Sequence, residues 1–261
     1  MLKKLTLFLF LFISITKPLT SEEIHKIGMQ IWQNEASGRK DLLVFWNKHE
    51  PFPSLGIGHC IWYPENYTGP YTQTFPDLCK YLQQYGITLP TWLDRAQDTG
   101  APWKDREEFL KDRQKTEELR DLLASTVELQ ILFMMERFNS QKLLIIKHAP
   151  SAQRNKIIKI FSLMQETLLG AYALIDYSNF KGCGLNPKEV SKGHRWGLLQ
   201  VLLNMPEDVT TQNVNKAFAV TAAQTLLILI KNSEPEYSRV KFMLGWMKRI
   251  STYADISLFN S

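Results

Sequence analysis

The chain has 261 residues, of which 44% are hydrophobic and 22% charged. This length allows one large domain or two small ones, and the hydrophobic content is ample for a core. The net charge of +5 falls to +3 without Lys3 and Lys4, a mild basic excess that suits an anionic polymer such as a cell wall. The excess is too small to indicate a nucleic-acid partner, and no dense basic run has interleaved aromatic residues.

The amino terminus has the pattern of a secretory signal peptide. Two lysines precede an apolar run from Leu5 to Ile15, which at about eleven residues is too short to span a bilayer as a helix. The sequence therefore predicts a signal peptide over residues 1–20, cleaved after Thr16 or Thr20 or retained as an anchor. A secreted or periplasmic protein is expected, with membrane contact only through this segment if it is uncleaved.

Cys60, Cys79 and Cys183 make an odd number of cysteines. In an oxidising compartment one pair can form a disulfide, and Cys60 and Cys79 are the nearer candidates. Neither a CxxC motif nor a histidine-rich spacing indicates a metal site. The sequence therefore predicts neither a metal nor a cofactor.

A first helix is predicted from Ser21, because Thr20 and Glu23 have the spacing of a capping box. Apolar residues recur at helical intervals along one side of this segment. They are Ile24, Ile27, Gly28, Ile31 and Trp32.

Continuing the apolar stripe places Glu35 on the buried side of the helix, beside Trp32. Burial disfavours a charged carboxylate, so we expect the pKa of Glu35 to rise toward the range of a general acid near neutral pH. The alternative is that Glu35 closes the helix and pairs with Arg39 or Lys40.

A short β-hairpin is predicted next. Leu42 to Trp46 is an apolar run, residues 47–51 indicate a turn, and Ser54 to Ile61 alternates as a second strand would. Gly56 and Gly58 leave one face of that strand without side chains. This absence marks the close approach of a ligand or another backbone, or else a bulged hairpin that needs glycine for its backbone alone.

The order of a helix-ending Glu35, a turn acid Glu50 and then Ser54-Leu-Gly-Ile-Gly-His59 resembles the active-site signature of phage-type (T4-like) lysozymes. In that family the glutamate is followed by a hairpin with an aspartate and a threonine, then Ile-Gly-Ile-Gly-His. Here Glu50 is the nearest substitute for the aspartate, and it lies closer to the Gly-Ile-Gly-His element. Ser54 takes the place of the threonine, which keeps the hydroxyl but loses the stiffness of a β-branched side chain.

The resemblance implies cleavage of a glycosidic bond, which commonly takes one carboxylic acid and one carboxylate. Glu35 would protonate the leaving oxygen, while Glu50 stays ionised and positions water with Ser54. His59 is expected to fix the hairpin through hydrogen bonds or to contact substrate. Trp62 would offer a flat apolar surface to a sugar ring, or else be an ordinary core aromatic.

Residues 64–102 are rich in proline, aromatic residues and turn formers, with a short helix near Pro76 to Tyr85, and could roof a cleft. From Trp103 onward the pattern is helical, which predicts a bundle. Trp246, Arg249 and Tyr253 share one face of its last helix and are expected to be structural. The predicted helices of the bundle cover residues 104–125, 127–138, 152–176, 211–231 and 235–253.

The segment from Asp176 to Gln200 concentrates polar, aromatic and glycine residues at a helix junction, which is typical of a binding loop. We expect Asp176, Asn179 and Arg195 to face the same groove as Glu35 and to contact sugar hydroxyls or peptide carboxylates. Gly197-Leu-Leu-Gln200 faintly resembles the Gly-Leu-Met-Gln element of goose-type lysozymes and lytic transglycosylases. The alternative is a helix start with an apolar stripe.

The predicted fold class is α+β, mainly α. A lysozyme-like helical domain would cover residues 21–261, with a hairpin lobe at about 36–65 beside the active-site cleft, an irregular excursion over 64–102 and a helical bundle over 103–261.

The predicted function is that of a monomeric peptidoglycan glycan-strand hydrolase that cleaves a β-1,4 bond in the manner of a muramidase. One alternative is a lytic transglycosylase that uses Glu35 alone. Another is a non-catalytic wall-binding or partner-binding module on the same scaffold, since a fold does not determine a function.

Overall fold

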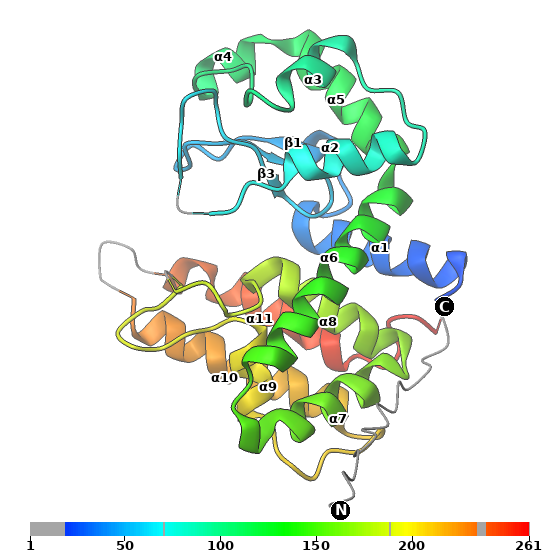
Figure 1. Ribbon diagram of the computed structural model, residues 1–261, viewed down its shortest axis with the longest axis vertical. Coiled ribbons are helices and arrows are strands. Elements are labelled where there is room, and N and C mark those ends of the chain that lie inside the picture. The colour runs from blue at the N-terminus through cyan, green and yellow to red at the C-terminus, as the bar shows by residue number, and fades with distance from the viewer. Residues whose placement is uncertain (1–18, 70, 188, 234–238, 261) are drawn as a thin grey trace, which may run out of the picture.

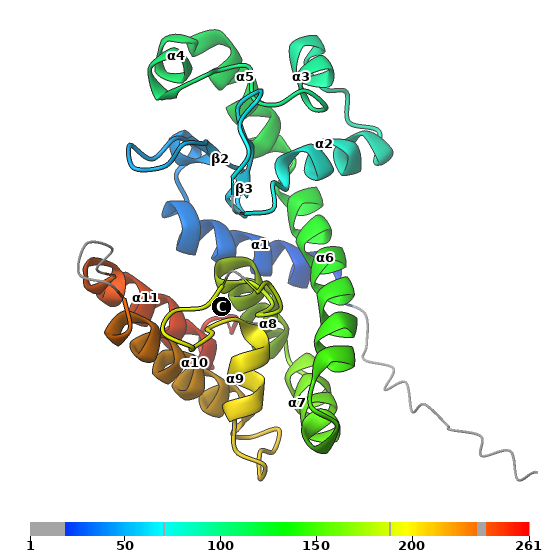
Figure 2. The same ribbon diagram turned by 60° about the vertical axis from the view of Figure 1, so that its left-hand side comes forward.

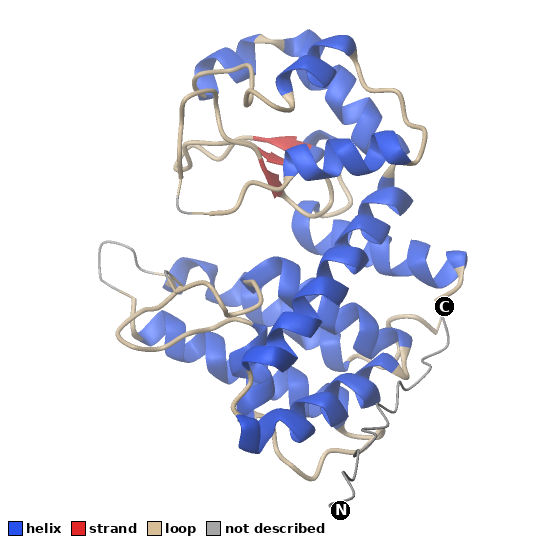
Figure 3. Cartoon of the chain, in the orientation of Figure 1, coloured by secondary structure: helices blue, strands red, loops and turns tan. Residues whose placement is uncertain are grey.

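The computed structural model describes residues 19–69, 71–187, 189–233 and 239–260. The predicted signal peptide lies outside the described residues, apart from its last two positions. The described chain is mainly helical with one small antiparallel sheet, which confirms the α+β, mainly α class. Within the described residues, strands occur in one part of the molecule, as Figure 3 shows.

The first helix, α1 (Ser21–Ala36), begins where its capping box predicts. The Thr20 side chain accepts from the Glu23 backbone N–H, and the Glu23 side chain accepts from the Thr20 N–H. The buried side of α1 packs against α6 (Val127–His148), the long helix that joins the two lobes of the molecule (Figure 1). A Cβ at Gly28 would lie 3.5 Å from Val127 Cγ1, which is an ordinary van der Waals contact, so this packing does not depend on glycine.

The small lobe contains the sheet and the short helices that follow it (Figure 2). Its elements are η1 (Lys40–Leu43), β1 (Val44–Phe45), β2 (Ser54–Leu55), β3 (Cys60–Ile61), α2 (Phe75–Gln84), α3 (Thr91–Ala96), α4 (Arg106–Lys111) and α5 (Arg113–Ser125). The large lobe contains η2 (Ser151–Gln153), α7 (Arg154–Gln165), α8 (Leu168–Lys181), α9 (Leu198–Asn204), α10 (Val214–Lys231), η4 (Val240–Phe242), α11 (Met243–Ser251) and η5 (Thr252–Ala254).

The boundary between the lobes differs from the predicted one. Residues 103–125 were expected to open the helical bundle, but α4 and α5 belong to the small lobe (Figure 1). The reason is an aromatic cluster. Phe109 of α4 lies 5.6 Å from Trp46 and 5.1 Å from Trp103 between ring centroids, so burying these rings draws α4 onto the sheet.

The predicted second strand is in fact two strands. β2 pairs with both β1 and β3, and residues 56–59 form a tight turn between β2 and β3. Gly56 has a φ of +73° and His59 a φ of +48°, and the His59 N–H donates to the Gly56 carbonyl at 3.2 Å. The Gly-Ile-Gly-His element is therefore a turn, and its glycine at position 56 supplies the left-handed backbone.

Residues of α6 occupy the space beside Gly56 and Gly58 where side chains would otherwise lie. A Cβ on Gly56 would lie 2.4 Å from Gln130 Oε1, and one on Gly58 would lie 3.1 Å from Met134 Sδ. Gln130 is buried, and its Oε1 accepts from the Ile57 N–H at 3.0 Å. The glycines thus let the turn lie directly on α6, which holds the sheet in place against the helix between the lobes.

Gly56→Ala is expected to lower the free energy of unfolding by about 2 kcal/mol or more, because it combines a strained positive φ with the loss of the buried Gln130 hydrogen bond. Urea denaturation measures the change. Gly86→Ala is the control, since Gly86 also has a positive φ but a Cβ there meets nothing within 4 Å. Equal losses in the two variants would show that contact with Gln130 contributes nothing.

The three cysteines, all of which lie in the described part of the chain, are free. The expected Cys60–Cys79 disulfide is therefore not formed in this structure. Both thiols are buried, and burial raises the pKa of each. A neutral buried thiol packs as a small apolar side chain and is a poor nucleophile.

Among the described helices, α10 is long and apolar enough to cross a membrane by length and composition. Of the residues in this helix, 44% are buried inside the protein. It packs against α7, α8, α9 and α11. Such packing is typical of a core helix in the large lobe.

Candidate active site

Glu35 lies in the last turn of α1, where its carboxylate is 10% exposed. Arg249 of α11 donates from Nη2 to Glu35 Oε1 at 2.7 Å, and Asn179 of α8 donates from Nδ2 to the same oxygen at 3.4 Å. His59 Nδ1 lies 3.4 Å from Glu35 Oε2. The carboxylate is thus the point at which α1, the 56–59 turn, α8 and α11 meet.

Asn179 forms hydrogen bonds with both the Glu35 carboxylate and the 56–59 turn. Its Nδ2 also donates to the Gly58 carbonyl at 3.0 Å. The amide group of Asn179 therefore contacts both Glu35 and the Gly-Ile-Gly-His element. Both lie far from α8 in the sequence. The predicted proximity of Asn179 to Glu35 is confirmed.

Arg249 is held in place by Asp176, which is fully buried. The guanidinium donates from Nε to Oδ2 and from Nη2 to Oδ1 of Asp176, both at 2.8 Å, in a bidentate pair. Tyr253 donates its hydroxyl to Asp176 Oδ2 at 2.6 Å, and Asn34 Nδ2 lies 3.3 Å from Oδ1. The prediction that Asp176 contacts substrate is wrong, because its carboxylate is enclosed by these three partners and positions Arg249.

The pKa of Glu35 is lowered, which is the opposite of the expected direction. Burial alone would raise the pKa, but the positive charge of Arg249, together with His59 and Lys181, outweighs it. The alternative pairing with Arg39 or Lys40 is also absent, since Arg39 pairs with Asp41 and Lys40 with Asp121. Glu35 is therefore a carboxylate at neutral pH in the free protein.

This lowered pKa makes part of the folding stability sensitive to acid. A carboxyl whose native pKa lies below its unfolded value stabilises the fold above the unfolded pKa, and this stabilisation is lost as the pH falls through the native pKa. We expect the wild type to lose more stability than Glu35→Gln between about pH 5 and pH 3. Urea unfolding at several pH values measures this. Parallel pH profiles of the two proteins would contradict the assignment.

A cleft of about 440 Å³ opens between the lobes beside this carboxylate. His59 and Asn179, both in contact with Glu35, line it, whereas Glu35 itself lies behind them and is not a lining residue. From the small lobe come Gly58, Ile61, Tyr71, Thr72 and Thr74, from α6 Arg137 and Gln141, and from the large lobe Phe180, Lys181, Trp196, Arg239 and Trp246 among others. A chain-like ligand in the cleft would therefore touch both lobes.

Ser54 is not among the lining residues, but it lies on the same face of the sheet as one of them. It pairs across the sheet with Ile61, and side chains of directly opposed residues emerge on the same face. Ile61 lines the cleft, so the side chain of Ser54 emerges from the same face of the sheet as a lining residue, while the neighbouring Leu55 is in the core.

Glu50 does not line the cleft. Its side chain is exposed in the turn after β1 and borders a separate cavity with Trp46, Tyr67 and Arg106. Partial burial raises the pKa of Glu50, and His59 opposes this rise. The imidazole of His59 thus influences both carboxyls, but the structure brings only Glu35 into contact with it. A role for Glu50 opposite Glu35 stays a prediction.

Two other predicted contact residues, Trp62 and Arg195, are not among the residues that line the cleft. Trp62 is fully buried, with its ring centroid 4.9 Å from that of Phe75 and 6.1 Å from that of Trp103, so it is a core residue of the small lobe. Arg195 donates from Nη1 to the Asn186 carbonyl at 2.9 Å and stabilises its own loop. The prediction that Trp62 contacts a sugar is wrong, because tertiary packing buries its ring. Arg195 is half-buried, and its role in substrate binding stays a prediction.

Sequence reasoning missed a cationic and aromatic cluster at the large-lobe wall. Lys181 Nζ lies 3.3 Å from the ring centroid of Trp246 and 3.9 Å from that of Phe180. Burial, together with the nearby Arg249, lowers the pKa of Lys181. Arg249 itself was expected to be only structural. The signal in the sequence was a lone arginine on an apolar helix face, one turn before Tyr253.

Within the ranges that the structure describes, histidine, cysteine, aspartate and glutamate side chains form no group of three that could hold a metal ion. Comparisons of the chain with protein-family models, curated proteins and solved structures find no match.

Proposed function

We propose that the protein has a lysozyme-like fold and cleaves the glycan strand of peptidoglycan or of a related β-linked amino-sugar polymer. The observation that carries this proposal is the contact of Glu35, through Asn179 and His59, with the Gly-Ile-Gly-His turn at the edge of the cleft between the lobes. On this proposal the protein acts outside the cytoplasm, where the signal peptide predicted over residues 1–20 would direct it.

In the proposed reaction Glu35 protonates the oxygen of the leaving sugar. Glu35 is ionised in the free protein, where Arg249, together with His59 and Lys181, favours the carboxylate, so this role requires that its pKa rise when substrate binds. Asp176 already accepts from Arg249, Tyr253 and Asn34, so Glu35 is the carboxylate that can take the proton and deliver it into the cleft.

Substrate in the cleft would favour this protonation. A sugar chain removes water from the carboxylate, and desolvation is the effect that already raises the pKa of Glu35 against its cationic neighbours. Glu35 can thus remain ionised in the free protein and become an acid once the cleft is filled. In the hydrolytic version of the proposal, Ser54 and Glu50 hold the attacking water.

A second candidate is a lytic transglycosylase that uses Glu35 first as acid and then as base. The position of Glu50 favours it, because that carboxylate is exposed and borders a cavity other than the cleft. In this reaction a hydroxyl of the substrate replaces water, and no second carboxylate is needed.

The experiment is to digest purified peptidoglycan with the wild type and with Glu50→Gln, and to identify the ends of the soluble products by mass spectrometry. Reducing ends, lost in Glu50→Gln, support the hydrolase. Anhydro ends that persist in Glu50→Gln support the transglycosylase. Protein that sediments with peptidoglycan and releases nothing soluble would replace both with a wall-binding module.

A further inference from the structure

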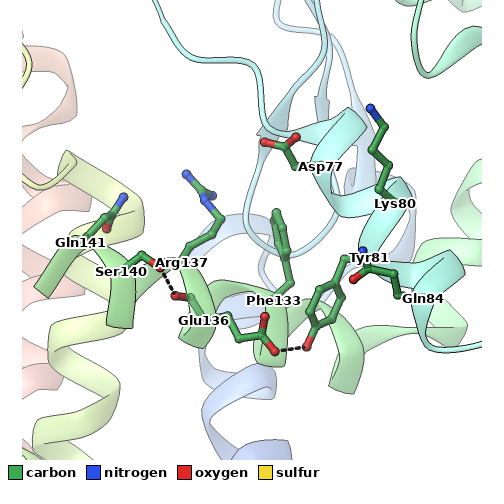
Figure 4. Close-up of a pocket in the computed structure, with 9 residues that line it drawn as sticks. All are labelled: Asp77, Lys80, Tyr81, Gln84, Phe133, Glu136, Arg137, Ser140 and Gln141. Carbon is green, nitrogen blue, oxygen red and sulfur yellow. Dashed lines mark hydrogen bonds between the residues drawn. The ribbon is translucent and has the colours of Figure 1, made fainter. Parts of the chain in front are cut away.

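A pocket of about 540 Å³ lies between α2 and α6 and opens off the cleft. Arg137 and Gln141, one helical turn apart on α6, line both the pocket and the cleft. Figure 4 shows the pocket, with Asp77, Lys80, Tyr81 and Gln84 on α2 and Phe133, Glu136, Arg137, Ser140 and Gln141 on α6. Nothing in the proposed cleavage reaction uses this pocket.

The pocket contains two acidic and two basic side chains, and half of them are already paired. Tyr81 donates its hydroxyl to Glu136 Oε1 at 3.1 Å, and Lys80 Nζ lies 3.0 Å from Asp98 Oδ1. Asp98 thus neutralises Lys80, and Glu136 keeps its negative charge but has a hydrogen-bond donor in Tyr81.

Asp77 and Arg137 are different. Neither side chain forms an ion pair or hydrogen bond with any other described residue. The Arg137 guanidinium carbon lies 5.5 Å from the ring centroid of Phe133. Arg137 projects from α6 at the end of the pocket away from Gln84, next to the cleft (Figure 4). A free carboxylate and a free guanidinium therefore remain in one pocket.

We propose that this pocket binds the peptide branch of the glycan, with Arg137 on a carboxylate and Asp77 on an ammonium group of the peptide. A ligand with charge of one sign would meet a like charge here, whereas a peptide that has both groups satisfies Asp77 and Arg137 together. The peptide would leave the glycan in the cleft at Arg137 and Gln141, the residues common to both cavities. This inference rests on the proposed function, since the glycan supplies the branch.

The test measures binding of the soluble stem tripeptide of peptidoglycan, alanyl-γ-glutamyl-diaminopimelate, to the full protein by isothermal titration calorimetry. We expect Arg137→Gln and Asp77→Asn each to weaken binding about tenfold, the effect of losing one charge-assisted hydrogen bond. Arg113→Gln is the matched control, because Arg113 lines a separate surface pocket with Phe109 and Glu117. We expect its affinity to equal that of the wild type.

The second measurement is the ratio of cleavage rates on intact peptidoglycan and on peptidoglycan stripped of its peptides by an amidase. We expect a wild-type preference for the intact polymer, reduced about tenfold in Arg137→Gln. Tripeptide binding that neither variant alters would overturn the proposal. Cleavage of neither polymer would overturn the proposed function, whereas the calorimetry would still decide whether the pocket binds the peptide.

Discussion

Arg249→Met is expected to lower the free energy of unfolding by about 3–5 kcal/mol, the usual cost of removing one partner from a buried ion pair. Arg249 is 7% exposed, and its guanidinium is the cation that contacts both Asp176, at 0% exposure, and Glu35, at 10%. Methionine fills a similar volume but leaves two carboxylates facing each other without a positive charge between them. Urea denaturation measures the loss.

Lys248→Met is the matched control for this variant. Lys248 precedes Arg249 on α11 but is exposed, so its replacement is expected to change stability by about 0.5 kcal/mol or less. Arg249→Lys keeps the charge and loses the bidentate geometry, and we expect it to fall between the two. A loss below about 1 kcal/mol in Arg249→Met would contradict the view that this cation holds the site together.

Glu35→Gln is expected to reduce the rate of glycan cleavage by about 10²- to 10⁴-fold, the contribution of a general acid. Glutamine is close in shape and can accept the Arg249 hydrogen bond, but it cannot deliver a proton to the leaving oxygen. The release of soluble sugar from purified peptidoglycan measures the rate.

The control is Glu128→Gln on α6, which removes a carboxylate from an exposed pair with His25 of α1 and is expected to leave the rate unchanged. Circular dichroism confirms that each variant is folded. A Glu35→Gln protein with more than half the wild-type rate would remove Glu35 from the reaction.

Features that depend on local sequence could be predicted. The capping box at Thr20 and Glu23, and the helical spacing of the apolar residues after it, correctly predicted α1 and the burial of Glu35 at its end. Capping and amphipathic periodicity act within a few residues, so they can be seen in the chain itself. The mainly helical class followed in the same way.

The charge state of Glu35 could not be predicted, because it depends on Arg249, which is 214 residues away. Burial was inferred correctly, but its effect on the pKa is reversed by a cation that only the folded chain brings close. Asp176 was placed in the right neighbourhood and given the wrong role, since its enclosure by Arg249 and Tyr253 involves a helix near the carboxyl terminus.

Aromatic residues were also misassigned from local pattern. Trp62 was expected to contact a sugar, but rings contributed by α2 and by residue 103 bury it completely. The same cluster moves α4 and α5 into the small lobe. Nothing in the neighbouring sequence distinguishes a tryptophan in a core from one in a cleft, because both need the same flat apolar ring.

The most direct test of the central claim is mass spectrometry of the soluble fraction after purified peptidoglycan is incubated with the wild type and, in parallel, with Glu35→Gln. The account predicts sugar fragments with newly formed ends from the wild type and none above background from the variant. Fragments from both proteins in equal amount, or from neither on several wall types, would contradict the claim that Glu35 cleaves a glycan in the cleft between the lobes.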